Sequence, residues 1–267
     1  MPFMACGNSM DDFLEDISEP ESVKMYYTDT LTVAHWNIGH FAMGRTDNTT
    51  ISIEDSESMA FEYRSLIDSI DADVFGVCEY NPTFSLGGEK TSSYIFCSYP
   101  NSIIGSQLSY NCNAIFSRTL LTESKVFFFE RCVQQRYYVV SKLPINGHEV
   151  IFVETHLDWD QSVDGKGCRA SQIQALVETL KGYEYVIICA DYNVSDVNEF
   201  LAFINAGFSL ASGDDFGLFP TYPTFNPLSV YDNIIVKGFF INNVSVINHK
   251  HLSDHCIIRC DLVFNDY

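Results

Sequence analysis

Residues 253–258 read SDHCII, a stretch that places an aspartate and a histidine directly before an apolar run. Asp254 and His255 are both costly to bury, yet the residues that follow them are typical of a buried β-strand. Charged groups tolerate such a place when an ion or an opposite charge compensates them. The stretch therefore predicts a polar site at the mouth of a strand, with partners supplied from elsewhere in the chain.

The composition fits one large domain with an acidic surface. The chain has 267 residues, 46% of them hydrophobic, and 35 acidic against 15 basic side chains give a formal net charge of −20. Such a charge does not attract polyanions, so a nucleic-acid substrate would need metal ions or a local basic groove. No apolar run approaches the roughly 20 residues of a membrane helix. We expect a flexible acidic tail over 1–22, a single domain over 23–267 and a monomer without a transmembrane segment.

The N-terminus and the cysteines both favour a reducing, cytoplasmic location. The N-terminal stretch 1–20 lacks the basic segment and apolar segment of a standard secretory signal. The nine cysteines form no C-x-x-C pair, and several lie in apolar runs such as VFGVC (74–78) and YVIIC (185–189). Cysteine in such a run behaves as a small buried hydrophobic residue. We therefore predict that the cysteines are buried without disulfides.

Short apolar runs recur along the chain, with a few helical patterns between them. Strands are predicted at 31–38, 72–79, 112–117, 125–130, 136–143, 149–157, 184–193, 231–240 and 254–264. Helices are predicted at 56–70, 169–181 and 197–207 from the spacing of apolar residues. Many strands with interspersed helices are typical of a layered α/β domain. Adjacent strands between 112 and 157 favour antiparallel pairing, so we predict mixed sheets packed face to face with helices outside.

Polar side chains stand at the ends of these apolar runs. They are carboxylates, amides and imidazoles, each next to a strand that would hold it rigidly: Asn37, Glu79, His156, Asp191, Asn193, Asp232, Asp254 and His255. A single Asp or Asn at a strand end is usually a turn former or a cap, and a single His is usually structural. The joint pattern is harder to explain in that way. Strand ends are where many α/β enzymes gather their catalytic side chains, so the pattern indicates a catalytic site.

The same residues lie in motifs that resemble those of the endonuclease/exonuclease/phosphatase superfamily, also called DNase I-like. In the family's order the motifs are HWNIGH (35–40), DADVFGVCE (71–79), NAIFSR (113–118), VETHLD (153–158), CRASQIQAL (168–176), ICADYN (188–193), TYPTF (221–225), YDNIIV (231–236) and LSDHCII (252–258). Four positions depart from the pattern: Cys78 replaces Gln, Ala190 replaces Gly, Asn233 replaces Tyr and Ile257 replaces Pro. None of these changes removes an expected ligand or acid–base group, so they concern the substrate class more than activity.

The resemblance implies a four-layer α/β/β/α sandwich with two central mixed β-sheets and one catalytic domain over 23–267. It also implies hydrolysis of phosphoester bonds by metal-assisted attack of water. This chemistry needs a positioned water, an acid for the leaving oxygen and positive charge near the phosphate. The implied metal ligands are Asn37, Glu79 and Asp254. Their oxygen donors favour Mg²⁺, with Mn²⁺ as a substitute.

The resemblance assigns the chemistry to five further residues. Asp191 would orient or deprotonate the attacking water, and Asn193 would hydrogen-bond the phosphate. His255 would contact the phosphate or act as an acid–base group, with Asp232 fixing its tautomer. His156 would bind a phosphate oxygen and protonate the leaving group.

Four other residues leave two interpretations open. His40 is near the site by sequence, which does not show that it touches substrate. Arg136 starts a strand and would either neutralise a phosphate or lie solvated at the surface. Arg169 is expected in a structural ion pair. Trp159 would either stack on a base or lipid headgroup, or stand at the rim without such a role.

The preferred function is a magnesium-dependent phosphodiesterase whose phosphoester substrate is a small molecule, a lipid headgroup or a nucleic acid. The R-x-x-Q helix after THLD resembles that of small hydrolases and sphingomyelinase-like members, and the net charge of −20 agrees. One alternative is a DNA or RNA endonuclease or exonuclease of the same superfamily. Another, of a different class, is a non-catalytic binding protein that retains the fold. The presence of every expected ligand argues against the binding protein.

Overall fold

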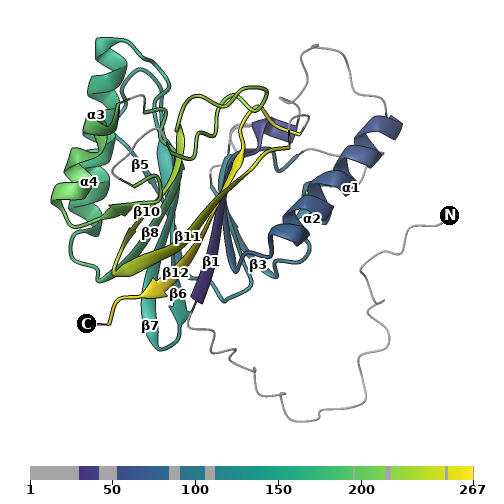
Figure 1. The fold of residues 1–267 in the computed structure, drawn as a ribbon, viewed down its shortest axis with the longest axis horizontal. Coiled ribbons are helices and arrows are strands. Elements are labelled where there is room, and N and C mark those ends of the chain that lie inside the picture. The colour runs from purple at the N-terminus through teal and green to yellow at the C-terminus, as the bar shows by residue number, and fades with distance from the viewer. Residues whose placement is uncertain are drawn as a thin grey trace.

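Two β-sheets pack face to face at the centre of the molecule, and helices cover both outer faces (Figure 1). The computed structural model describes residues 30–41, 53–83, 91–105, 112–194, 196–213, 218–249 and 252–266. The predicted acidic tail at 1–22 lies outside these residues. Within them, the predicted four-layer α/β sandwich with two mixed sheets is confirmed. Among the described helices, none is long and apolar enough to cross a membrane.

The first sheet contains six strands in the order β11-β12-β1-β2-β4-β3. Their bounds are β1 Thr30–Asn37, β2 Val74–Tyr80, β3 Asn101–Ile104, β4 Cys112–Ser117, β11 Phe239–Ile247 and β12 Ile257–Phe264. β1 and β2 are parallel, and the other neighbours are antiparallel. Because parallel strands end at the same edge of a sheet, Asn37 lies opposite Cys78, one residue before Glu79.

The second sheet also contains six strands, in the order β5-β6-β7-β8-β10-β9. Their bounds are β5 Thr122–Phe128, β6 Tyr137–Ile145, β7 His148–His156, β8 Tyr185–Asp191, β9 Ser209–Leu210 and β10 Asp232–Lys237. β7 and β8 are parallel, and the other neighbours are antiparallel. The register places His156 opposite Asp191 and Asp191 opposite Asp232. Three predicted site residues therefore stand side by side on adjacent strands.

The helices lie on the two outer faces (Figure 1). α1 Ile53–Ile70 and α2 Thr91–Ile95 cover the first sheet, and α3 Val163–Leu180 and α4 Leu201–Asn205 cover the second. Short 3₁₀ turns, η2 Gly39–Phe41 and η3 Val197–Phe200, follow β1 and precede α4. α3 begins six residues before the predicted start because the Ser162 hydroxyl accepts a hydrogen bond from the Gly165 N–H, which caps the helix earlier.

Three apolar clusters fill the three interfaces between the layers. Tyr63 and Ile67 of α1 pack with Trp36 and Phe75 against the outer face of the first sheet. Alternate residues of both sheets, such as Val33 and Phe152, form the cluster between them. α3 contributes Ile173 and Leu176 to the third cluster, on the outer face of the second sheet. The two layers of strands are therefore held rigidly on both faces, which fixes the side chains at their ends.

Two of the differences between the predicted and the observed strands affect the site or its neighbourhood. The strand predicted at 231–240 is two strands, β10 and β11, because Gly238 adopts φ 79° and breaks the run between them. A Cβ at that position would lie 2.4 Å from the Glu184 carbonyl oxygen, so only glycine fits this turn. The last strand begins at Ile257 rather than 254. Asp254 and His255 therefore belong to the turn before β12. From this turn their side chains line the same pocket as the polar side chains at the ends of the other strands.

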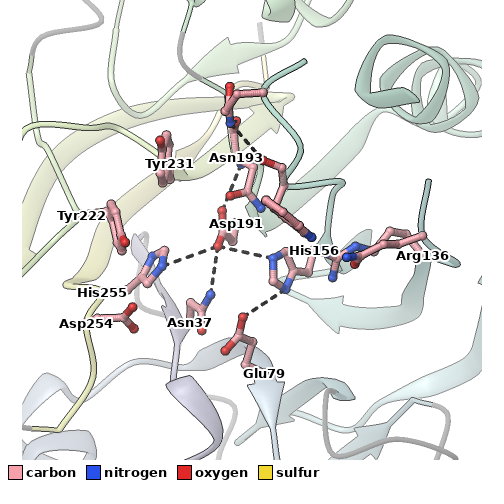
Figure 2. Close-up of a pocket in the computed structure, with 13 residues that line it drawn as sticks. Asn37, Glu79, Arg136, His156, Asp191, Asn193, Tyr222, Tyr231, Asp254 and His255 are labelled. Carbon is pink, nitrogen blue, oxygen red and sulfur yellow. Dashed lines mark hydrogen bonds and ion pairs between the residues drawn. The ribbon is translucent and has the colours of Figure 1, made fainter. Parts of the chain in front are cut away.

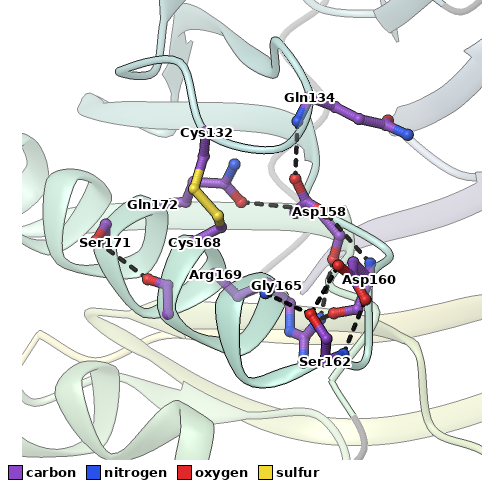
Figure 3. Close-up of a disulfide and its surroundings, with 11 residues drawn as sticks. Cys132, Gln134, Asp158, Asp160, Ser162, Gly165, Cys168, Arg169, Ser171 and Gln172 are labelled. Atoms are coloured by element: carbon purple, nitrogen blue, oxygen red, sulfur yellow. Dashed lines mark hydrogen bonds between the residues drawn. A yellow bond between two sulfur atoms is a disulfide. The ribbon is translucent and has the colours of Figure 1, made fainter.

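The prediction that the cysteines are buried without disulfides is wrong for three of the described ones: Cys97 is exposed, and Cys132 and Cys168 form a disulfide. Cys132, in the segment after β5, is bonded to Cys168 of α3 (Figure 3). The two cysteines are 36 residues apart in sequence, so no local sequence motif predicts that they pair. Disulfides are typical of oxidising environments, and the cysteines therefore no longer support a reducing location. The cytoplasmic location stays a prediction.

Candidate active site

A pocket of about 550 Å³ opens at the edge where β1, β2, β7 and β8 end (Figure 2). Seven of the eight predicted site residues line it: Asn37, Glu79, His156, Asp191, Asn193, Asp254 and His255. The eighth, Asp232, is fully buried behind His255. The chain thus brings together side chains from both sheets that are up to 218 residues apart in sequence, as the strand-end pattern predicted.

Asp191 is the central acid of the pocket and is almost fully buried. One of its oxygens, Oδ2, accepts a hydrogen bond of 2.9 Å from the Asn37 amide. The other, Oδ1, accepts one of 3.0 Å from the backbone N–H of Asn193. Asn193 has φ 52°, an uncommon left-handed conformation for a residue other than glycine. Burial, followed by the charge of Asp232, raises the pKa of Asp191 to about 6.

His156 and His255 flank Asp191 on opposite sides (Figure 2). The Nε2 atoms of the two rings lie 3.5 and 3.8 Å from Asp191 Oδ2. Burial and the nearby Arg136 charge lower the pKa of His156 well below its ordinary value, so this ring is neutral near pH 7. Burial also opposes charge on His255, but the carboxylates of Asp232 and Asp191 outweigh it and raise its pKa to about 10. The two histidines therefore offer different chemistry.

Asp232 holds the far side of the His255 ring. The His255 Nδ1–H donates to Asp232 Oδ2 at 2.8 Å, so Nε2 faces the pocket. The backbone around the ring is also fixed. The His255 N–H donates to the Ser253 hydroxyl, and that hydroxyl donates to the Asn37 carbonyl oxygen at 2.7 Å. This arrangement is the one expected of a carboxylate that sets the tautomer of a histidine.

The three predicted metal ligands lie along one side of the pocket, with Asn37 between Glu79 and Asp254 (Figure 2). Glu79, one residue before the end of β2, has φ 52°, a strained backbone conformation for a residue other than glycine, and its side chain lines the pocket. Its two oxygens lie 3.2 Å from His40 Nε2 and 3.8 Å from His156 Nδ1. Carboxylate and amide oxygens from several strand ends suit a hard divalent cation. The donor set is therefore compatible with Mg²⁺.

Arg136 is a pocket residue rather than the solvated surface charge that was one of its two interpretations. Its side chain lines the pocket, and only 7% of the residue is exposed. Its Nε is buried without a hydrogen-bond partner among the described atoms, and burial lowers the pKa of the guanidinium. A buried cation without a bonded anion is unfavourable by itself. The pocket therefore contains a fixed positive group that an anionic ligand would satisfy.

The structure also places Arg169 and Trp159, for which the sequence left the role open. Arg169 is structural, as expected: it is fully buried and pairs with Glu199 at 2.8 Å. It also donates to the carbonyl oxygens of Asp158 and Asp160 (Figure 3). Trp159 lines the pocket and remains 56% exposed, so it stands at the rim.

The sequence did not single out six residues of the site. Four of them line the pocket: Gln134, Gln161, Tyr222 and Tyr231. The tyrosines lie inside the quoted motifs TYPTF and YDNIIV, which was the available signal, whereas the glutamines lie in loops without a pattern. The other two, His35 and Glu154, lie buried beneath the pocket. Each precedes a predicted site residue by two positions on a strand, so it faces the same way, and this alternation would have found it.

Comparisons with known proteins agree with this geometry. A model of the endonuclease/exonuclease/phosphatase family matches residues 34–255. The structure of humanized D. rerio TDP2 superimposes with a TM-score of 0.68 at 18% identity, covering 88% of this chain and 99% of that one. D. rerio TDP2 complexed with single-strand DNA product gives 0.67 at 17% identity, with 87% and 98% covered. A family protein from Bacteroides vulgatus gives 0.69 at 16% identity, with 88% and 99% covered. At such identities the structural likeness shows a shared fold. No curated protein sequence is significantly similar to the chain.

Proposed function

The chain belongs to the endonuclease/exonuclease/phosphatase family, and from that premise we propose that it is a magnesium-dependent phosphodiesterase. Family membership supports hydrolysis of phosphoester bonds, and members generally use a divalent metal ion. The observation that carries the proposal is the arrangement around Asp191. A buried carboxylate, held by two hydrogen bonds and flanked by two imidazoles, faces a pocket that also contains the guanidinium of Arg136, whose buried Nε has no hydrogen-bond partner among the described atoms.

Asp191 would position the attacking water and accept its proton. Both of its oxygens are already fixed by Asn37 and the Asn193 backbone, so the carboxylate cannot rotate away from the water. A pKa near 6 is well matched to a general base that works near neutral pH. The side chain of Asn193 lines the same pocket and would hydrogen-bond a phosphate oxygen.

Arg136 and His255 would hold the phosphate from two sides. Arg136 supplies a positive charge whose buried Nε has no hydrogen-bond partner among the described residues, and guanidinium groups match the oxygens of a phosphate. His255 is positively charged near pH 7 and would donate from Nε2 either to the phosphate or to the leaving oxygen. His156 is neutral, so its role would be to hydrogen-bond a phosphate oxygen rather than to protonate the leaving group.

Asn37, Glu79 and Asp254 would hold the metal ion. When bound, Mg²⁺, or Mn²⁺ in its place, would supply positive charge to the phosphate oxygens and favour deprotonation of water. The acidic groups that crowd the pocket would then gain a counterion. All of these residues belong to one copy of the chain, so we also propose that a monomer is active.

The proposed substrate is a compact phosphodiester, either a small molecule or a lipid headgroup. The net charge of −20 disfavours long polyanions. A nuclease is the second candidate, because the fold is shared with D. rerio TDP2, whose structure contains a single-strand DNA product. The exposed Trp159 at the rim offers a face on which a base would stack.

The direct experiment is hydrolysis of bis-(p-nitrophenyl) phosphate with Mg²⁺. We expect turnover by the wild-type chain, and a loss of at least about 100-fold in kcat for Asp191→Asn, because a general base contributes 10²–10⁴-fold. Asp196→Asn is the matched control. Asp196 is an exposed carboxylate that caps η3, and asparagine caps a helix equally well. Its activity should equal that of the wild type.

A substrate panel then separates the candidates. It contains single-strand DNA, nicked duplex DNA, RNA, sphingomyelin and inositol phosphates, each tested with Mg²⁺ and with Mn²⁺. Preference for sphingomyelin or a small phosphodiester supports the first proposal, and preference for DNA or RNA supports the second. A chain that hydrolyses none of them, including bis-(p-nitrophenyl) phosphate, would be a binding protein that retains the fold.

A further inference from the structure

A chain of buried polar contacts runs from the pocket into the space between the sheets. His255 Nδ1 lies 2.8 Å from Asp232 Oδ2, and Asp232 Oδ1 lies 3.2 Å from His35 Nε2. His35 Nδ1 in turn lies 3.2 Å from Glu154 Oε2. His35, Asp232 and Glu154 are all fully buried. The residues in these three contacts are 23, 197 and 119 positions apart in sequence, so only folding brings them together.

His35 is the link between the two sheets. It projects from β1 of the first sheet and contacts Asp232 of β10 and Glu154 of β7, which flank β8 in the second sheet. Both ring nitrogens face a carboxylate, and both oxygens of Asp232 face an imidazole. Asp232 therefore cannot turn about its Cβ–Cγ bond without losing a contact. The orientation of His255 depends on Asp232, which in turn depends on His35.

The backbone of β2 is shaped to admit Glu154. Gly76 lies opposite His35 in the parallel pair of β1 and β2. A Cβ at Gly76 would lie 2.1 Å from Glu154 Oε2 and 2.8 Å from Cys189 Cβ. No side chain fits there while Glu154 keeps its place. Three residues on three strands, His35, Gly76 and Glu154, are thus mutually dependent.

Stability alone does not account for this arrangement. Glu154 Oε1 is buried without a hydrogen-bond partner among the described atoms, which is unfavourable. Buried ion chains are often no more stable than apolar residues of similar volume. A buried carboxylate that is destabilising in this way, and that is joined to the pocket histidine His255 by three successive contacts, indicates a role in the site.

We propose that His35 and Glu154 are positioning residues that hold Asp232, and through it His255, in the orientation needed for phosphate chemistry. This inference deepens the proposed function and rests on it. The two residues touch no substrate and act only through the ring of His255. Their loss should therefore lower kcat more than it raises KM, because Arg136 would still hold the phosphate.

The test is Glu154→Gln, because glutamine has the same size and its carbonyl oxygen still accepts from His35. We expect kcat for bis-(p-nitrophenyl) phosphate to fall about 10-fold, in the range seen when outer partners of metal-bound histidines are removed, with KM within about twofold of wild type. In a His255→Ala background the same substitution should have no further effect, because the unit is already disabled. Independent, multiplying losses, or a rise in KM alone, would overturn the proposal.

Asp73→Asn is the matched control for a merely structural effect. Asp73 is a partly buried carboxylate just before β2, at the end of the strand away from the pocket, where it accepts from the Thr32 N–H at 2.8 Å. Its loss should lower the melting temperature without changing kcat. If Asp73→Asn lowered kcat as much as Glu154→Gln, the effect would be one of general stability, and the positioning role would be wrong.

A second measurement does not depend on activity or on any variant folding. Nitrogen-15 NMR of the histidine side chains in the wild-type chain should show ring N–H protons of His35 that exchange slowly with water. A freely exchanging ring would overturn the proposal even if the enzyme were active, and protected protons would support it even if no substrate were found.

A ligand atom of Cys78 lies within 4.8 Å of those of His35 and Glu154. Stoichiometric zinc that is lost in Cys78→Ser would make these residues metal ligands and would also overturn the proposal.

Discussion

Gly76→Ala is the substitution whose effect follows most directly from the packing between the sheets. Gly76 lies in the middle of β2, a central strand of the first sheet, with fully buried neighbours on both sides. The added methyl group would lie 2.1 Å from Glu154 Oε2 and 2.8 Å from Cys189 Cβ, well inside van der Waals contact. Neither neighbour has room to withdraw, because Glu154 is fully buried and Cys189 belongs to the core between the sheets.

The expected loss of stability has two parts. Overpacking a close-packed core by one methyl group costs about 1–3 kcal/mol. Displacing Glu154 from His35 disturbs a buried charged contact of 3.2 Å, and removing one partner of such a pair costs about 3–5 kcal/mol. Partial displacement gives a total of about 3 kcal/mol. For a domain of this size, about 2–4 °C is lost per kcal/mol, so the melting temperature should fall by roughly 6–12 °C.

The assay is thermal unfolding followed by circular dichroism, with Gly167→Ala as the matched control. Gly167 is an exposed glycine inside α3, and a Cβ there would have no atom within 4 Å. Alanine should stabilise the helix there by about 0.5–1 kcal/mol. If Gly76→Ala melted within about 2 °C of the wild type, Glu154 would not occupy the place described, and the buried chain of contacts would be wrong.

Four further predictions concern the pocket and its charges. Glu79→Gln should fold normally and lose most activity, with part recovered at high Mg²⁺ in a metal titration; full activity at low Mg²⁺ would remove Glu79 from the ligands. Arg136→Gln should raise KM for bis-(p-nitrophenyl) phosphate and lower kcat. The combined fall in kcat/KM should correspond to a loss of about 1.5–3 kcal/mol of transition-state stabilisation, as expected for a charge-assisted contact. Unchanged kinetics would refute the phosphate role of Arg136. Burial opposes charge on His35 and His255, but adjacent carboxylates raise both pKa values from about 6.5 to about 10. The stability that these two rings contribute is complete below pH 6.5 and is lost as the pH rises towards 10. The free energy of unfolding, measured with urea between pH 6.5 and 8, should therefore fall by up to about 1.4 kcal/mol per pH unit for each ring. A rise in the free energy of unfolding over this range would contradict the two pKa shifts. Binding of an oligonucleotide to Asp191→Asn at constant Mg²⁺ should show a shallow salt dependence, about two phosphate contacts or fewer at roughly −0.9 each, and five or more would reveal a basic groove.

The sequence predicted the layers and most of the site because both depend on local patterns. Alternating or continuous apolar runs identified the long strands, and the polar residue that ends each run identified Asn37, Glu79, His156 and Asp191. The rigid hydrophobic strands then bring those ends to one edge. The short elements escaped, since β3 and α2 have four and five residues and carry too little periodicity to be seen.

What the sequence could not predict depends on contacts between distant segments. The Cys132–Cys168 disulfide joins a loop to a helix without any spacing signal. The environment of Arg136 is similar in kind, because an arginine at a strand start is usually solvated and only the folded pocket buries it. His35 and Glu154 each look like an isolated polar residue in an apolar strand until the sheets are packed together.

The most direct measurement of the central claim, that water positioned by Asp191 attacks phosphorus in this pocket, is a single turnover in ¹⁸O-labelled water. The enzyme is held in excess over bis-(p-nitrophenyl) phosphate with Mg²⁺, and the p-nitrophenyl phosphate formed is analysed by mass spectrometry. We predict that the product of the first turnover carries one ¹⁸O atom. Unlabelled product with ¹⁸O in the protein would show that a carboxylate is the nucleophile, and that result, or the absence of any product, would contradict the account.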